Sequence, residues 1–178
     1  MIRKLVDANL NPIGFDNYSG IDVQPSLGNA FIENIAPGCT MVFKKKIVQI
    51  IQKLNVRADD YYMHDWIIYL LAANYGRVYF DNYQSILYRQ DVNAVGSPVG
   101  RTSQIKRRVN NLKKMVRSVK QQIKSFTSLN IMNSGYTSVA QDLISPNIFK
   151  RVRAINSGKV YRQNKKDDFI YKTIIMFW

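Results

Sequence analysis

The stretch "YYMHDWIIYLLAANYG", residues 61 to 76, places a histidine and an aspartate in front of an apolar run that ends in glycine. The apolar run predicts a buried helix from about His64 to Asn74, with Gly76 placed to end it. Asp65 would lie in its first turn, where free N–H groups and the helix macrodipole stabilise a charged carboxylate. Two interpretations follow: Asp65 is a helix cap, or it is an oriented general base.

The segments on either side of this helix predict a mixed α/β fold. Residues 3–14 indicate a short strand and a turn, and residues 40–43 form a β-rich run. Downstream, residues 77–82 and 85–90 predict two short strands, as a hairpin or as neighbours. A helix is also expected upstream, from apolar positions at helical spacing: Ile47, Ile50, Ile51 and Leu54. This order of elements belongs to the α/β class.

Composition limits the class of protein. With 178 residues, 46% of them hydrophobic, the chain has enough apolar surface for one core, so we expect one domain with an appendage. The single cysteine, Cys39, excludes an intramolecular disulfide and a paired-cysteine metal site, and suits a reducing compartment. We also expect no signal peptide and no membrane-spanning segment, because no apolar run is long enough.

Charge divides the chain into two parts. Residues 1–100 carry nine Lys/Arg and nine Asp/Glu, whereas residues 101–178 carry seventeen and three. The whole net charge of +14 therefore lies after residue 100. We expect residues 1–100 to be the catalytic or binding body, and residues 101–178 to be a basic helical extension attracted to polyanions or anionic lipid.

Apolar residues recur at helical spacing through the first part of the basic extension, which predicts a long amphipathic helix. A second helix is expected from Leu143 to Ile155. Asp167 and Asp168 are placed to cap a third helix, which leads to the C-terminal aromatics. The residues of the first stripe are Ile105, Val109, Leu112, Val116, Val119, Ile123 and Phe126.

This apolar stripe has two interpretations. With the terminal Phe177 and Trp178, it would dock the protein on an anionic membrane surface. Alternatively, the stripe packs on the body and its charges are merely solvated. Nucleic-acid binding through phosphate contacts is disfavoured, because a continuous apolar stripe suits a groove poorly.

Three segments in order resemble a known family: "GCTMVF" from residue 38, "MHDWIIYLLAANYGRVYFDN" from residue 63, and "ILYRQDVNAVG" from residue 86. They resemble the C-terminal half of family 2 glycosyltransferases, specifically the rhamnosyltransferase-like members that build bacterial surface polysaccharides. The resemblance implies a GT-A fold. It also implies inverting transfer of a sugar from a nucleotide-sugar donor to a glycan or lipid-linked oligosaccharide acceptor.

The resemblance assigns roles to particular residues. It makes Asp65 the general base that deprotonates the acceptor hydroxyl. It places Arg89 and Gln90 at the donor diphosphate. It also implies a divalent metal ion, Mg²⁺ or Mn²⁺, for which Asp91 offers oxygen ligands where the family has a histidine. The acceptor cleft would be formed by His64, Trp66 and a loop of small residues, Gly38, Cys39 and Thr40. The alternative interpretation of this loop is a plain turn before a strand.

The chain also departs from the family pattern. Its beginning resembles the stretch just after the family's metal-binding Asp-x-Asp motif, so we expect the nucleotide-binding half to be absent and the chain alone to be inactive. A truncated product, a fragment and one piece of a split enzyme with a separate N-terminal half all remain open. A non-catalytic remnant and a basic membrane- or nucleic-acid-binding protein are the alternatives. The expected location is cytoplasmic and peripheral, on the inner face of the cell membrane.

Overall fold

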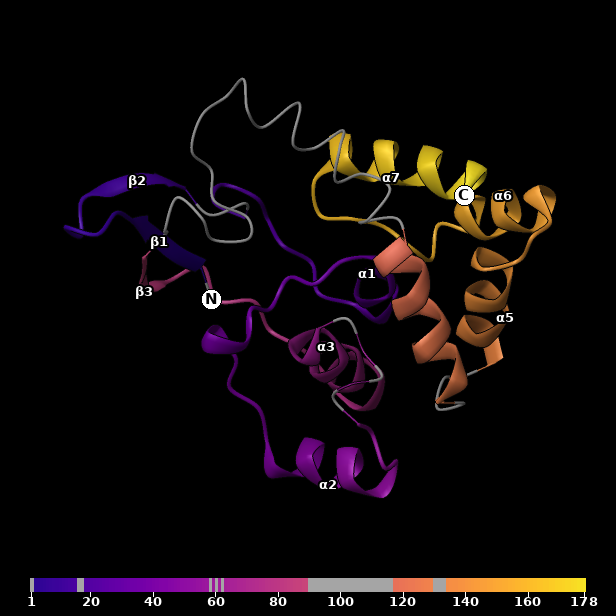
Figure 1. The fold of residues 1–178 in the computed structure, drawn as a ribbon, viewed down its shortest axis with the longest axis horizontal. Coiled ribbons are helices and arrows are strands. Elements are labelled where there is room, and N and C mark those ends of the chain that lie inside the picture. Colours follow the sequence, from indigo (N-terminus) through magenta and orange to yellow (C-terminus); the bar gives the residue numbers. More distant parts are fainter. Residues whose placement is uncertain are drawn as a thin grey trace.

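A computed structural model describes residues 2–15, 18–57, 59, 61, 63–89, 117–129 and 134–178. The architecture is mixed α/β and mostly helical, as Figure 1 shows. A small three-stranded sheet lies at one end of the molecule, and the C-terminal helices lie at the other. The expected α/β class is confirmed at this level.

The sheet consists of β1 (Ile2–Val6), β2 (Pro12–Phe15) and β3 (Gln84–Arg89), in the order β2-β1-β3. β1 and β2 form the antiparallel hairpin whose turn the sequence indicated, and β3 pairs parallel to β1. The carboxylate of Asp7 accepts hydrogen bonds from the backbone N–H groups of Asn9 and Asn11, both at 2.8 Å. The bond from Asn11 in particular holds the pKa of Asp7 below its ordinary value.

Two expected strands are wrong. Residues 77–82 form no strand, so the hairpin predicted with β3 does not exist. Residues 41–44 are likewise unpaired, after the short 3₁₀ helix η1 (Gly38–Thr40), and Val42 is 89% exposed. β-branched and aromatic residues favour a strand only where a neighbouring strand is available to pair with them.

The predicted helices before residue 90 are present as α2 (Lys45–Lys53) and α3 (His64–Tyr75), and Gly76 ends α3 as expected. A further helix, α1 (Leu27–Ile32), was not predicted. Its N-cap is Ser26, whose hydroxyl accepts from the Asn29 N–H at 3.0 Å. All six of its residues are buried, and it packs against α3.

After residue 116 the structure describes four helical segments: residues 117–128, α5 (Ser134–Leu143), α6 (Ile148–Asn156) and α7 (Lys165–Phe177). The helix expected from Leu143 to Ile155 is present as α6, but it begins later than expected, because α5 ends at Leu143 and Asn147 caps α6.

The expected caps of the last helix are also wrong. Asn164 is the N-cap of α7, and its side chain accepts from the N–H groups of Lys166 and Asp167. Asp167 and Asp168 lie in the first turn instead, where they still suit the positive end of the helix.

One hydrophobic core takes residues from both electrostatic parts of the chain. Phe126 packs edge-on against Phe31 and Trp66, and Ile175 from α7 belongs to the same core. Within residues 117–129, the predicted stripe is buried at Val119, Ile123 and Phe126. The interpretation that the stripe packs on the body therefore holds there, and the expected extension is, where described, part of the body. The earlier stripe positions, from Ile105 to Val116, lie outside the described residues.

A partly buried ion pair joins the two parts. Arg162 lies 3.1 Å from the carboxylate of Glu33, which is 4% exposed. The other carboxylate oxygen of Glu33 accepts from the backbone N–H of Gln163 at 2.7 Å. Arg162 also stacks on the ring of Tyr171, with its guanidinium carbon 3.9 Å from the ring centroid. The ion pair and the hydrogen bond to Glu33 thereby hold the segment before α7 against the end of α1.

Candidate acceptor site

Asp65 is the second residue of α3 and is 6% exposed. One carboxylate oxygen accepts from the backbone N–H of Gly38 at 3.0 Å, and the other accepts from Nδ2 of Asn34 at 2.8 Å. The N-cap of α3 is Met63, which has no capping side chain, so the interpretation of Asp65 as a cap is wrong. Asp65 instead bonds across to the loop that follows α1, and this fixes the direction of its carboxylate.

Asn34 belongs to the same constellation, and the sequence gave no indication of it. Its Oδ1 accepts from the backbone N–H of Ala36 at 3.0 Å. Since that bond occupies the carbonyl oxygen, the amide NH₂ is the end that faces Asp65. Asn34 therefore holds both the loop and the carboxylate.

Gly38 and His64 lie against each other beside this carboxylate. A Cβ built on Gly38 would lie 3.5 Å from Nε2 of His64 and 3.9 Å from Oδ2 of Asp65. The lack of a side chain at residue 38 thus leaves space directly in front of both groups. His64 is exposed, so its imidazole is accessible to solvent. The structure brings Gly38, His64 and Asp65 together, although residue 38 is far from the other two in sequence.

The other two residues of the loop differ in exposure. Thr40 is buried, and its hydroxyl donates to the carbonyl of Pro37 at 2.8 Å, which stabilises η1. Cys39 is exposed and carries a free thiol. Thr40 therefore shapes the loop from within, whereas Cys39 faces outward.

Trp66 lies in the core. It is 5% exposed, and its indole N–H donates to the carbonyl of Ala30 at 2.6 Å. Its ring meets Phe126 edge-on at 6.1 Å between centroids. The expectation that Trp66 offers a face to a sugar does not fit this position, because the ring is already covered by α1 and by residues 117–128.

Arg89, which was expected at the donor diphosphate, is not brought to this constellation. Arg89 is exposed at the end of β3, where it pairs in register with Val6, and Figure 1 shows the sheet well separated from α3. Gln90 and Asp91 lie outside the described residues. Among the residues that are described, no three His, Cys, Asp or Glu side chains gather as ligands for a metal ion.

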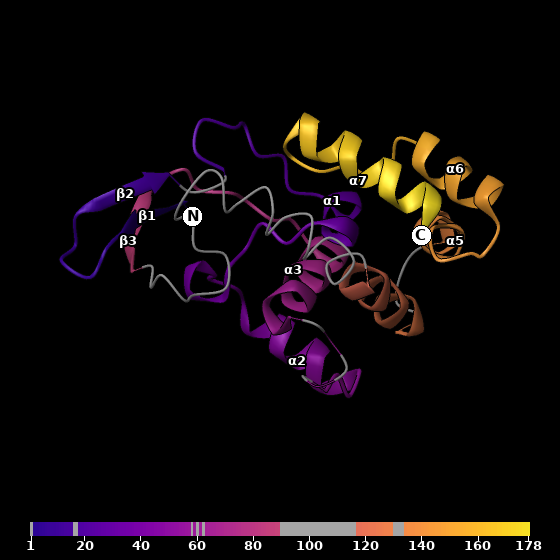
Figure 2. The same ribbon diagram turned by 45° about the horizontal axis from the view of Figure 1, so that its top comes forward.

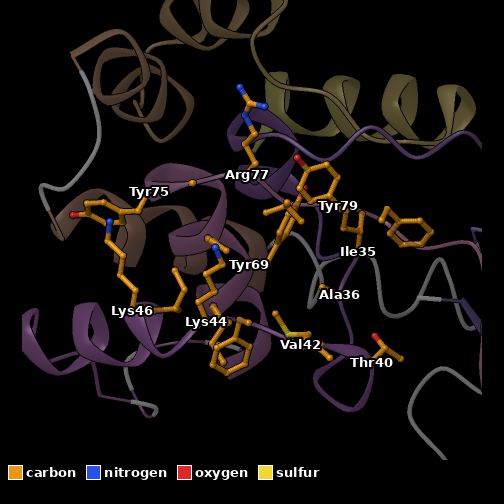
Figure 3. A pocket seen from close by; sticks show the side chains of 18 residues that line it. Ile35, Ala36, Thr40, Val42, Lys44, Lys46, Tyr69, Tyr75, Arg77 and Tyr79 are labelled. Atoms are coloured by element: carbon orange, nitrogen blue, oxygen red, sulfur yellow. The ribbon is translucent and has the colours of Figure 1, made fainter.

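A cavity of about 640 Å³ begins close to Asp65, between α2, α3 and residues 77–80 (Figure 3). Ile68, Tyr69 and Ala72 line it, and they follow Asp65 at helical spacing on one face of α3. Asp65 itself does not line the cavity, which starts about one helical turn, or roughly 5 Å, farther along the helix axis. Thr40 connects the loop of the Asp65 constellation to the cavity wall.

Comparison with family models, curated proteins and solved structures found no match to this chain.

Proposed function

We propose that this chain is the acceptor-side part of an inverting family 2 glycosyltransferase, similar to rhamnosyltransferases, in which Asp65 is the general base. The observation that carries the proposal is the bond from the Gly38 N–H to the Asp65 carboxylate. It joins two of the three segments on which the resemblance rests, at the residue that the resemblance makes catalytic. The donor-binding half, with its nucleotide-sugar and divalent metal ion, would come from a longer or separate chain.

The proposed transfer step requires one group from this chain, a base for the acceptor hydroxyl. The acceptor hydroxyl oxygen attacks the anomeric carbon of the donor sugar, and the nucleotide diphosphate leaves from the opposite face with the bonding electrons. A carboxylate beside that hydroxyl takes its proton as the new bond forms. The carboxylate of Asp65 has two fixed donors, and a carboxylate accepts about four hydrogen bonds, so acceptor positions remain for a substrate hydroxyl.

Asp65→Asn tests the role of the base. With the donor-binding half supplied in fusion or as a second chain, the variant should lose sugar transfer by at least about a hundredfold and keep its affinity for the donor. Asp59→Asn is the matched control, because Asp59 is an exposed carboxylate in the connection before α3. Transfer by Asp65→Asn close to that of the parent would refute the base. Absence of transfer from the parent with every donor would favour a non-catalytic protein.

Acceptor binding can be measured on the chain as it stands. His64 is the only histidine of the chain, so the NMR resonance of its imidazole Cε1–H is a single reporter beside Asp65. A panel of hexose and deoxyhexose oligosaccharides should include ligands that shift this resonance saturably. Gly38→Val should abolish the shift by filling the space in front of His64, whereas Gly14→Val, in an open position on β2, should leave it unchanged.

We also propose that the protein works at an anionic membrane surface, through the outer face of α7. Among the described residues no helix combines the length and the apolar character needed to cross a bilayer. α7 lies along the outer edge of the molecule in both Figure 1 and Figure 2. Phe169 and Phe177, two turns apart, are each 73% exposed, and Ile170 between them is 50% exposed. Exposed lysines begin the same helix, and this combination suits the boundary between lipid headgroups and acyl chains.

A further inference from the structure

The cavity between α2 and α3 has a lining chemistry that the proposed transfer does not use. Its volume of about 640 Å³ is that of a small-molecule site. Its walls come from residues 35–47 and residues 68–80, two segments that lie before and after Asp65 in the sequence and that the fold brings together. Most of the lining is apolar or aromatic, and it includes no Asp or Glu.

The charges that line the cavity are all positive. Lys44, Lys46 and Arg77 contribute to its wall. In Figure 3 the side chains of Lys44 and Lys46 extend from the start of α2 toward α3, whereas that of Arg77 points away from them. Within the part of the chain that the structure describes, no side chain of these three makes a hydrogen bond or an ion pair. Two lysines therefore share one side of the cavity without a counter-charge from the described residues.

This arrangement costs stability in the absence of a ligand. Lys44, Lys45 and Lys46 follow one another at the positive end of α2, and the first turn of that helix has no acidic residue. Cations at this end of a helix are disfavoured by the helix macrodipole. A bound dianion would relieve both the mutual repulsion of the lysines and this unfavourable placement.

Aromatic side chains border the same cavity. Tyr79 is 83% exposed and Tyr75 is 43% exposed, although both line the cavity wall. Phe43, next to Lys44, is 41% exposed. Large rings that remain this exposed beside a cavity offer a flat apolar surface to a ligand. An aromatic ring of the ligand that stacked on them would have one of its faces covered.

We infer that the cavity between α2 and α3 binds an organic phosphate, with the phosphate at Lys44 and Lys46 and an apolar or aromatic body against Tyr79 and Phe43. A phosphate monoester suits two ammonium groups because it carries nearly two negative charges, and lysine binds phosphate as a point charge. This inference does not rest on the proposed function, because Asp65 does not line the cavity.

The first experiment uses three probes and isothermal titration on the whole chain. Phenyl phosphate should bind one to one, at least about tenfold more tightly than inorganic phosphate or phenol, because only phenyl phosphate has both halves of the recognised group. Uridine monophosphate and octyl phosphate then distinguish a soluble nucleotide-like ligand from a lipid-like one. Failure of all the phosphate monoesters to bind saturably would overturn the inference.

Variants locate the binding. Lys44→Gln/Lys46→Gln should weaken phenyl phosphate binding by at least about tenfold, since hydrogen bonds between charged groups are stronger than those between neutral groups. Lys45→Gln/Lys53→Gln is the matched control, because it removes the same charge from α2 at two positions that do not line the cavity. Equal weakening by both pairs would mean non-specific attraction and would contradict the site.

A third variant tests the apolar half. Tyr79→Ser should weaken phenyl phosphate and leave inorganic phosphate unchanged, because the ring contributes only to the body of the ligand. Far-ultraviolet circular dichroism of each variant confirms that α2 and α3 are intact. Loss of affinity for both probes on Tyr79→Ser would place the ligand elsewhere. The His64 resonance keeps this outcome separate from the acceptor proposal, since it reports on Asp65 and not on the cavity.

Discussion

At the scale of single residues, the structure depends on close backbone contacts that side chains would prevent. Gly28 lies in α1, against the segment that leads to α7. A Cβ at this position would lie 1.7 Å from the carbonyl oxygen of Lys159. No side-chain movement can relieve a contact with backbone of this kind, so the glycine is required by the approach of the two segments.

Gly28→Ala should therefore destabilise the protein by about 1–3 kcal/mol or more, because the added methyl forces residues 157–163 away from α1. Urea unfolding followed by circular dichroism measures the change. Gly14→Ala is the control, since a Cβ there meets nothing within 4 Å. Equal stability of Gly28→Ala and the parent would show that this contact is not made in solution.

The residues of the candidate site were predictable to different degrees. Asp65 and Gly38 were expected together, because both lie in segments that resemble one family. Asn34 was not, since its role depends on a contact made 31 positions away in the chain. Trp66 was expected at the acceptor but lies in the core, because an aromatic beside a proposed catalytic residue can serve the core as well as the substrate, and only the packing of Phe126 distinguishes the two.

At the scale of elements, periodicity over several turns predicted α2 and α3, whereas short segments held by tertiary contacts were missed. α1 has only six residues and is stabilised by its cap and its burial against α3. Tyr69 of α3 is central to that contact. Its hydroxyl donates to Oδ1 of Asn29 at 2.8 Å and accepts from the backbone N–H of Ser26 at 3.2 Å.

Burial of this hydroxyl makes the α1–α3 contact sensitive to alkaline pH. Burial raises the pKa of Tyr69 above its ordinary value of 10.0. The unfolded chain therefore loses this proton at a lower pH than the folded chain. The stabilising contribution of protonated Tyr69 is complete below pH 10.0 and is lost as the pH rises above it.

Tyr69→Phe should cost about 1–2 kcal/mol at neutral pH, because Oδ1 of Asn29 loses a buried donor. The stability of the variant should then fall less steeply than that of the parent between about pH 9 and about pH 11. Urea midpoints across this range measure both effects. Tyr79→Phe, at an exposed tyrosine, is the control and should follow the parent. Parallel curves for Tyr69→Phe and the parent would contradict the assignment.

At the scale of the whole molecule, the division into a neutral and a basic part describes charge but not folding. The two parts share one core, and the partly buried ion pair between Glu33 and Arg162 joins them. Composition alone did not reveal this, because net charge reports on partners and solubility and carries little information on which surfaces pack. The basic character remains at the surface, where it is available for an anionic partner.

The apolar residues that remain exposed define where that partner would bind. The sequence had indicated Phe177 and Trp178, but the indole N–H of Trp178 donates to the carbonyl of Leu143 at 3.1 Å. Lys120 also lies over its ring, at 5.6 Å from the centroid. Trp178 therefore serves to hold α7 on the body. Phe169 and Phe177 are the pair on the outer face of α7 that an anionic membrane would bury.

Replacing Phe169 and Phe177 by Ser should weaken binding to vesicles that contain anionic lipid by at least about tenfold, since burying each ring contributes about 1.5–3 kcal/mol. Raised salt should weaken the parent as well, by screening its lysines and arginines. Val42→Ser/Tyr83→Ser is the control, because it removes two exposed apolar side chains away from α7. Co-sedimentation with vesicles, beside a duplex DNA shift assay at matched salt, separates the alternatives. If the parent ignores anionic vesicles, yet both it and the α7 variant bind duplex DNA, the membrane surface is wrong and phosphate-driven nucleic-acid binding takes its place.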